Sequence, residues 1–328
     1  MTFQILSLSG GGYLGLYTAA VLAEIEQRSE RKLIDCFDLI AGTSIGGIIA
    51  LGLSAGRTAT EIRDAFLESG PKVFNRTTPK TPVGEWLRFA RRVPAPLYDP
   101  KSLRAIIDEI VGSKCRMSEL HRPVTIPAVN LTKGGPKIFK TGHHKRFILD
   151  WKLLVSDVAM ATSAAPTYFP AHVIGNELFA DGGLFANSPD MIALHEAEEF
   201  LNVHRDRISI LSVGTTTTDF AMSSDLNPKL GAFGWMRNNR LTDVMIGSQQ
   251  AITNDMMIHR LKGRYLRIDR RQADAQKREL ALDVATPAAT KNLMAMAASS
   301  FAEVTGDPRL IGFLEHTAPK FDFINSTI

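Results

Sequence analysis

Cysteine is scarce in this sequence, which has only Cys36 and Cys115 among its 328 residues. Two cysteines cannot form the dense disulfide framework of a small secreted domain, and their scarcity is typical of a reducing compartment. Long apolar runs are also missing, since no uncharged run that is apolar throughout approaches the roughly 18 residues that a membrane-spanning helix needs. The first apolar run begins at Phe3, so we expect no signal peptide. We therefore expect a cytosolic protein.

A large excess of one charge is absent as well. Lysine and arginine number 38 against 34 aspartates and glutamates, a formal net charge of +4. This mild bias suits association with an anionic surface, and we expect no nucleic acid polymer as a partner. Hydrophobic residues make up 45% of the chain and charged residues 22%, which is ordinary for a globular protein. The length allows one large α/β domain with insertions or two smaller domains.

Two glycine-bearing turns lie near the N-terminus. The sequence Leu-Ser-Gly-Gly-Gly at 8–12 follows the apolar run 3–8, and Gly-Thr-Ser-Ile-Gly at 42–46 follows the apolar run 37–41. The second turn has the Gly-x-Ser-x-Gly form of a nucleophile elbow, in which a strand turns sharply into a helix and exposes the serine hydroxyl. The helix behind Ser44 would also point its N-terminal dipole at negative charge that develops there.

The first turn fits two kinds of site. The spacing Gly10-x-Gly12-x-x-Gly15 matches the dinucleotide-binding fingerprint, which needs an acidic residue about 20 positions on, at the end of the next strand. Glu30 is near that distance, but it lies in the charged stretch 24–32, before the second strand. We therefore favour an oxyanion hole, in which glycine N–H groups converge on a substrate oxygen. A dinucleotide-dependent oxidoreductase is the alternative.

A third motif, Asp181-Gly182-Gly183 followed by Asn187-Ser188-Pro189, lies between an apolar stretch and a helical pattern. The three motifs in this order resemble the patatin-like phospholipase family over at least residues 3–213. The resemblance implies a Ser–Asp dyad without histidine, with Ser44 as nucleophile, Asp181 as base, and Gly10, Gly11 and Gly12 as the oxyanion hole. One departure is that the family often has Arg or Lys two residues after the third glycine, whereas this chain has Tyr13 and Leu14 there.

The resemblance also implies a fold and an activity. The fold would be an α/β, three-layer α/β/α sandwich around a mostly parallel central sheet. It would form a single domain over 1–328, with core motifs in 3–213 and a C-terminal extension, 214–328, that supplies a lid or regulatory segment. The activity would be phospholipase A-type hydrolysis of membrane phospholipid esters through an acyl-enzyme, with no cofactor.

The opening sequence Ser-Leu-Ser-Gly-Gly-Gly-Tyr-x-Gly-Leu-Tyr at 7–17 is most similar to bacterial patatins that cyclic nucleotides activate in anti-phage signalling. This similarity implies a cyclic nucleotide activator and a homo-oligomer. It also implies peripheral contact with the inner face of the membrane, where the phospholipid substrate lies. An unregulated cytosolic lipid esterase is the alternative.

The histidines test whether a triad could replace the dyad. A Ser–His–Asp hydrolase of the usual α/β order needs a histidine after the acid. The candidates are His195, His204, His259 and His316. None of them has a distinctive local motif, so we favour the dyad. The adjacent pair His143 and His144 does not predict a metal site, because sequence neighbours do not face one another on a helix or a strand.

The most basic stretch of the chain is 258–271. One interpretation is a solvated strand face. The other is an anion site, because arginine makes bidentate contacts with phosphate, and on this basis we predict Arg264 and Arg267 as ligand-binding residues. The segments 70–100 and 219–235 are candidates for a lid over the serine. In the first, Trp86 and Phe89 lie beside arginines, which suits either an anionic lipid interface or a solvated loop.

Apolar periodicity predicts the secondary structure. We expect helices at 14–28, 45–53, 60–67, 102–111, 153–165, 191–201, 241–257 and 291–304. We expect strands at 3–8, 37–41, 124–130, 137–140, 208–213 and 265–268.

Overall fold

The computed structural model describes residues 2–74, 96–216, 231, 234–235, 240–273, 276 and 279–324. An eight-stranded sheet runs through this part of the chain in the order β5-β6-β3-β2-β1-β7-β8, with β4 also paired to β3. Its parallel strands are β1 (Phe3–Leu8), β2 (Leu39–Gly42), β3 (Val124–Asn130), β7 (Ile208–Val213) and β8 (Tyr265–Ile268). Its antiparallel strands are β4 (Gly135–Lys140), β5 (His172–Ile174) and β6 (Glu177–Asp181).

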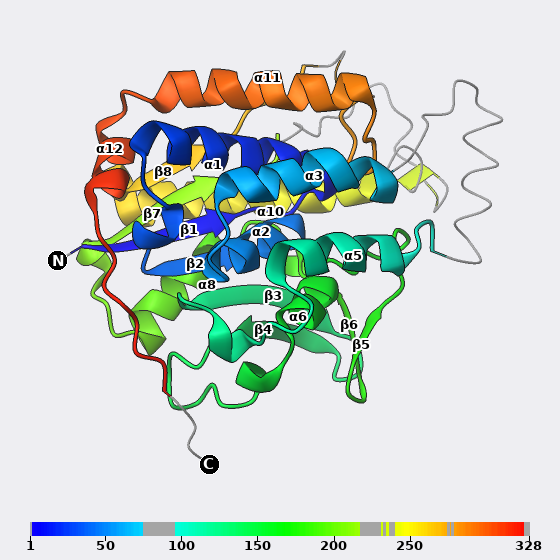
Figure 1. The fold of residues 1–328 in the computed structure, drawn as a ribbon, viewed down its shortest axis with the longest axis horizontal. Helices are drawn as coiled ribbons and strands as arrows, with labels where there is room; N and C mark the ends of the chain where they lie inside the picture. Colours follow the sequence, from blue (N-terminus) through cyan, green and yellow to red (C-terminus); the bar gives the residue numbers. More distant parts are fainter. Residues whose placement is uncertain are drawn as a thin grey trace.

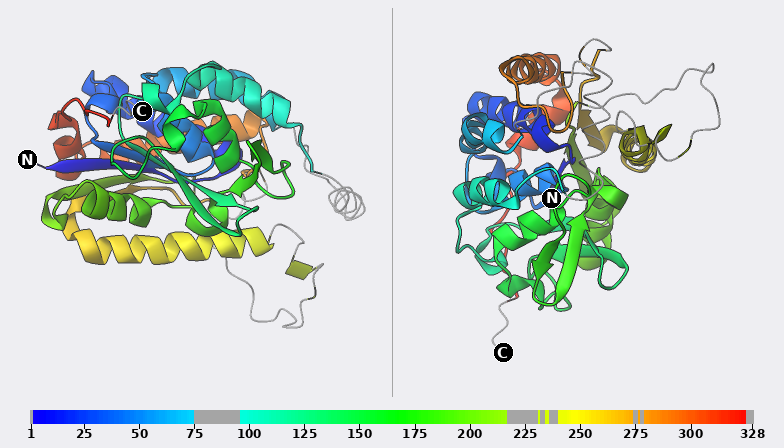
Figure 2. Two further views of the ribbon diagram at one scale, coloured as in Figure 1. Left: turned by 90° about the horizontal axis from the view of Figure 1, so that it is seen from below. Right: turned by 90° about the vertical axis from the view of Figure 1, so that its right-hand side faces the viewer.

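Helices cover both faces of this sheet, which confirms the expected three-layer α/β/α fold (Figures 1 and 2). One face carries α1 (Gly15–Ser29), α2 (Ile45–Ser54), α3 (Ala59–Val73), α5 (Pro100–Val111), α6 (Val155–Thr162) and α11 (Pro287–Val304). The other carries α8 (Asp190–His195) and α10 (Arg240–Leu261). The short helix α7 (Gly183–Ala186) contacts α10 and β3, and the short helix α12 (Pro308–Glu315) lies at one margin of the molecule (Figure 1).

The side chains of β1 alternate between two apolar cores. Leu6 and Leu8 pack on the side of α1 and α2, whereas Ile5 packs with Leu194 of α8 and Met257 of α10. The side chains of Ile5, Leu6 and Leu8 are all fully buried. A parallel strand covered on both faces is apolar almost throughout, and this is why the sequence predicted β1, β3, β7 and β8 with their observed ends.

The register of the parallel strands sets where the site forms. Leu8 of β1 pairs with Gly42 of β2 and with Val213 of β7, so the carboxyl ends of these three strands lie level. Strand β6 runs antiparallel to β3 and places Asp181 opposite Ala128. In an open α/β sheet the crevice at these carboxyl ends is the usual place for a ligand. All three motifs singled out from the sequence leave the sheet here.

Some elements differ from expectation. Helix α6 ends at Thr162 rather than 165, ahead of Pro166, and the predicted helix 191–201 is α8 followed by a π-helical turn at Glu196–Phe200. The hairpin of β5 and β6 and the helix α12 were not predicted. Beyond residue 213, β8 adds to the same sheet beside β7, and α11 packs against α1.

Two further sequence expectations concern the membrane. The segment 75–95, with Trp86 and Phe89, and most of 219–235 lie outside the described residues, so the two lid candidates stay predictions. Within the described ranges, no helix has both the length and the apolar character to cross a membrane. Both Cys36 and Cys115 are free thiols.

Candidate active site

Ser44 lies at the sharp turn between β2 and α2. Its backbone has φ 55° and ψ −124°, a conformation that non-glycine residues adopt rarely and at a cost in energy. The turn also brings backbones into contact, since a Cβ atom on Gly42 would lie 2.2 Å from the Gly46 carbonyl oxygen. The Ser44 N–H donates to Thr162 Oγ1 at 3.0 Å, and the Thr162 hydroxyl donates to the Pro127 carbonyl at 2.6 Å. These contacts hold the nucleophile elbow that the sequence predicted.

The side chains of Ser44 and Asp181 meet at this turn. The Ser44 hydroxyl donates to Asp181 Oδ2 at 2.6 Å, and the Gly183 N–H donates to Asp181 Oδ1 at 2.7 Å. Asp181 is buried, and burial raises the pKa of its carboxyl to about 6, although these two hydrogen bonds oppose the rise. A carboxylate with a pKa near neutrality, within hydrogen-bond distance of a hydroxyl, can act as a general base.

The three glycines at 10–12 have different environments. The Gly10 N–H donates to the Asn187 carbonyl at 2.9 Å, so this amide is used within the protein. Gly11 and Gly12 line the cavity beside Ser44. We therefore expect Gly11 and Gly12 to supply the oxyanion donors and Gly10 to fix the loop.

Close packing explains why these positions are glycine. A Cβ atom on Gly11 would lie 2.2 Å from Thr215 Oγ1. One on Gly12, where φ is +56°, would lie 2.2 Å from the Leu282 carbonyl oxygen. Side chains at either position would push the loop away from its neighbours.

A cavity of about 250 Å³ opens at Ser44. Its lining is mostly apolar and comes from both ends of the chain; it includes Ile45, Ile48, Phe74, Phe169, Met245 and Leu282. Such a lining with few polar groups is typical of a site for a hydrophobic ligand, and here it suits an acyl chain.

Comparison with known proteins identifies the family. Residues 6–194 match the family described as Patatin-like phospholipase. The chain belongs to the patatin-like phospholipase family. It is 37% identical over 320 residues to a cGAMP-activated phospholipase of Pseudomonas aeruginosa, covering 97% of this chain and 93% of that protein. It is also 37% identical over 340 residues to a cGAMP-activated phospholipase of Vibrio cholerae, covering 97% and 96%.

More distant relatives were also found. Patatin-like protein 2 of Arabidopsis thaliana is 31% identical, covering 78% of this chain and 70% of that protein. Among solved structures, VipD from Legionella pneumophila matches with a TM-score of 0.41 and 11% identity, covering 91% of this chain and 67% of that one. As a patatin-like phospholipase the protein is a serine hydrolase, which sets aside the dinucleotide-dependent oxidoreductase.

The histidines of this patatin-like phospholipase lie away from the cavity. Within the described residues no histidine lines it. His316 contacts Asp38 at 2.9 Å, and the other three candidates for a triad are exposed, namely His195, His204 and His259. The buried His143 contacts Glu196 at 2.9 Å and lies outside the cavity lining. This geometry agrees with a Ser–Asp dyad.

The two arginines predicted as ligand-binding residues both make contacts within the protein. Arg267 is largely enclosed, with 15% of its side chain exposed, and its Nη2 donates to Asp269 Oδ2 at 2.7 Å. Arg264 is about one-third exposed; it donates to the carbonyl of Ile208 at 2.7 Å and to that of Arg205. Neither guanidinium lines the cavity. A ligand-binding role for either stays a prediction.

Helix α10 contributes a contact that the sequence did not reveal. The Gln249 side chain accepts a hydrogen bond from the Asn187 N–H at 3.1 Å and donates to the Leu184 carbonyl at 3.2 Å. It therefore fixes the segment that follows Asp181. A glutamine on a helix has no pattern that predicts this role, because the contact depends on how α10 packs against α7.

Proposed function

We propose that this patatin-like phospholipase cleaves acyl esters of membrane phospholipids through Ser44 and Asp181. The observation that carries the proposal is the 2.6 Å hydrogen bond from the Ser44 hydroxyl to Asp181 Oδ2 beside an apolar cavity. The bond gives the nucleophile a base, and the cavity gives the acyl chain a place near it. The family membership supports this assignment.

The reaction proceeds in two steps. Ser44 Oγ attacks the ester carbonyl while its proton passes to Asp181. The amides of Gly11 and Gly12, together with the N-terminus of α2, stabilise the oxyanion of the tetrahedral intermediate. Asp181 then gives the proton to the departing alcohol, which leaves an acyl-enzyme. In the second step water attacks the acyl group, Asp181 takes a proton from the water, and this proton returns to Ser44 as the fatty acid leaves.

We also propose that cGAMP activates the enzyme. The support comes from the names of two relatives that are 37% identical over nearly the whole chain. A phospholipase that was always active would attack the membrane of the cell that makes it, so the activity needs a switch. We propose that it acts as a homo-oligomer at the inner face of the membrane, in anti-phage defence.

Phospholipid vesicles provide the test of both parts. We expect fatty acid release from phosphatidylglycerol and phosphatidylethanolamine vesicles to rise at least about tenfold, or about 1.4 kcal/mol in barrier, when cGAMP is added. A linear dinucleotide of the same bases serves as the control. Full activity without nucleotide would contradict the switch. No release from any vesicle at any cGAMP concentration would contradict the phospholipase assignment.

A variant tests whether Arg264 contributes to the activator site. A ligand shifts a two-state equilibrium only by its difference in affinity between the states. Arg264→Ala is therefore expected to raise the cGAMP concentration for half-maximal activity without lowering the maximal rate. Lys291→Ala removes an equal charge from an exposed position on α11 and should change neither value. An unchanged half-maximal concentration in Arg264→Ala would remove this residue from the site.

A further inference from the structure

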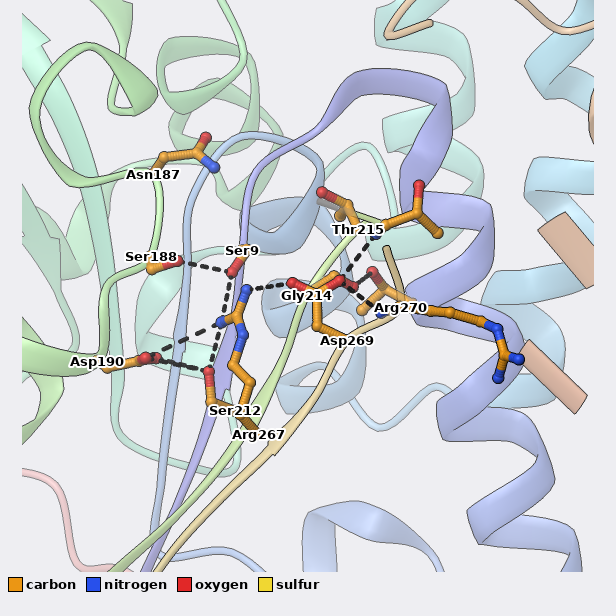
Figure 3. Close-up of polar contacts among 12 residues, drawn as sticks. Ser9, Asn187, Ser188, Asp190, Ser212, Gly214, Thr215, Arg267, Asp269 and Arg270 are labelled. Atoms are coloured by element: carbon orange, nitrogen blue, oxygen red, sulfur yellow. Dashed lines mark hydrogen bonds and ion pairs between the residues drawn. The ribbon is translucent and has the colours of Figure 1, made fainter. Parts of the chain in front are cut away.

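Arg267 connects the strand β8 to the loop that carries the oxyanion glycines (Figure 3). Its Nη1 donates to Ser9 Oγ at 3.1 Å and to Ser212 Oγ at 2.8 Å. Ser9 is the residue immediately before Gly10, and its hydroxyl also lies 3.0 Å from Ser188 Oγ. The side chain of Ser9 thus joins Arg267 to the glycine loop and to the segment of Asn187, both of which contribute to the cavity lining.

Two carboxylates hold the guanidinium in place. Asp269 Oδ2 accepts from Arg267 Nη2 at 2.7 Å, and Asp190 Oδ2 lies 4.0 Å from Nη1. Asp190 is itself fixed, because it accepts hydrogen bonds from Ser212 at 3.0 Å and from Tyr265 at 2.9 Å. Burying an arginine is costly unless its charge is paired and its donors are used. Here the two carboxylates pair the charge, and Nη1 and Nη2 make hydrogen bonds to Ser9, Ser212 and Asp269.

Asp269 extends the connection to the other side of the glycine loop. Its Oδ1 accepts from the Thr216 N–H at 3.1 Å. The neighbouring residue Thr215 donates its hydroxyl to the Gly10 carbonyl at 2.8 Å and packs against Gly11. The glycine loop is therefore fixed at Ser9 by Arg267 itself, and at Gly10 and Gly11 by a segment that Asp269 anchors.

We propose that Arg267 is a positioning residue for the oxyanion hole, which fixes the glycine loop so that the amides of Gly11 and Gly12 face the developing oxyanion. This inference rests on the proposed function. Arg267 acts through Ser9 and Asp269 and does not touch the substrate. Arginine suits this role because its planar guanidinium donates in several fixed directions at once, whereas lysine presents a single point charge. The role differs from the anion site predicted from the sequence.

The matched pair Ser9→Ala and Ser212→Ala tests the proposal. Each change removes one buried hydroxyl that accepts from Arg267 Nη1. The Ser9 hydroxyl also contacts Ser188, and the Ser212 hydroxyl also donates to Asp190. Only Ser9 belongs to the glycine loop. Because losing one oxyanion donor costs about 10²–10³ in kcat, a displaced loop should cost about tenfold or more in Ser9→Ala. KM should change less than about twofold, and Ser212→Ala should keep kcat within about twofold.

The values of kcat and KM are measured with a soluble fatty acyl ester at saturating cGAMP. The thermal midpoint of unfolding shows whether each variant is folded. Ser9→Cys, of similar size, is measured alongside and replaces Ser9→Ala if that variant does not fold. Arg267→Lys should lower kcat as Ser9→Ala does, and combining the two should cost little more than either alone, because both act through one contact. The half-maximal cGAMP concentration should stay unchanged in Arg267→Lys.

The pH profile separates this role from an effect on the dyad. The midpoint of kcat against pH should be the same in Ser9→Ala and wild type, because Asp181 is untouched. Equal kcat values for the Ser9 and Ser212 variants would overturn the proposal and leave Arg267 with a stabilising role only. A shifted midpoint, or a raised half-maximal cGAMP concentration with full kcat in Arg267→Lys, would also overturn it. Inactive wild type under all conditions would instead overturn the proposed function.

Discussion

Replacing Ser44 with alanine is expected to lower ester hydrolysis by about 10³-fold or more while the protein stays folded. The change removes the nucleophile, and alanine keeps a Cβ atom at the φ 55° position, so it adds no atom that the elbow must accommodate. Fatty acid release from vesicles measures the loss, and the thermal midpoint checks the fold. Activity within about tenfold of wild type, or about 1.4 kcal/mol in barrier, would place the nucleophile elsewhere.

Asp181→Asn is expected to be nearly as damaging. Asparagine has the size of aspartate, and its oxygen can still accept from the Gly183 N–H. Its amide group then faces Ser44 Oγ, so the serine becomes a hydrogen-bond acceptor and has no base to take its proton. Activity is measured as for Ser44→Ala.

The histidine variants are the matched controls for the dyad. Each of His195→Ala, His204→Ala, His259→Ala and His316→Ala should retain most activity, because none of these side chains lines the cavity. A loss of about 10³-fold in one of them, with the fold unchanged, would indicate a triad.

The raised pKa of Asp181 predicts opposite effects of pH on activity and stability. Because the base must be ionised, kcat should rise with pH through about 6 and then level off. Burial disfavours the ionised carboxyl, so the folded protein binds this proton more tightly than the unfolded chain, where the pKa is near 3.8. The stability that protonation contributes is full below pH 3.8 and is lost as pH rises through about 6.

Asp181→Asn should therefore gain stability relative to wild type as pH rises through this window. One pKa unit corresponds to about 1.4 kcal/mol, so the free energy of unfolding of the variant should gain at most about 3 kcal/mol relative to wild type. Denaturant unfolding of both proteins at pH 4 and pH 7.5 measures the difference. A relative stability that does not change between these pH values would contradict the raised pKa.

The sequence predicted the parallel part of the sheet closely but not its antiparallel edge. Strands such as Ile208–Val213 are buried on both faces, so they are apolar runs bounded by turn residues. The strand His172–Ile174 has only three residues, with none buried, and it forms because Glu177–Asp181 pairs with it and with β3. Such pairing depends on tertiary contacts that local patterns do not contain.

The site was predictable where a motif carries the chemistry. Ser44 and Asp181 stand in turns whose glycines are visible in the sequence, and the structure brings them together across 137 positions. The hydrogen bond of the Gly10 amide within the protein was not predictable, because its acceptor, the carbonyl of Asn187, is far away in the sequence.

Arg267 shows which contacts a charge pattern does not reveal. The basic stretch around it suggested an exposed strand face or an anion site, whereas in the structure only 15% of the side chain is exposed and the guanidinium contacts Asp269. Its partner Asp269, two residues further on, was a signal that the sequence did contain. The contact of Arg267 with Ser9 was not visible in the sequence, because the two residues are 258 positions apart.

Covalent labelling with a long-chain alkyl fluorophosphonate tests the central claim most directly. In this reaction Ser44 Oγ bonds to phosphorus, fluoride leaves, and the serine proton passes to Asp181. In the presence of cGAMP we expect one phosphonyl group per chain, located by peptide mass spectrometry on Ser44, with hydrolysis lost in proportion to labelling. A label on another residue, or hydrolysis that survives complete labelling of Ser44, would contradict the account.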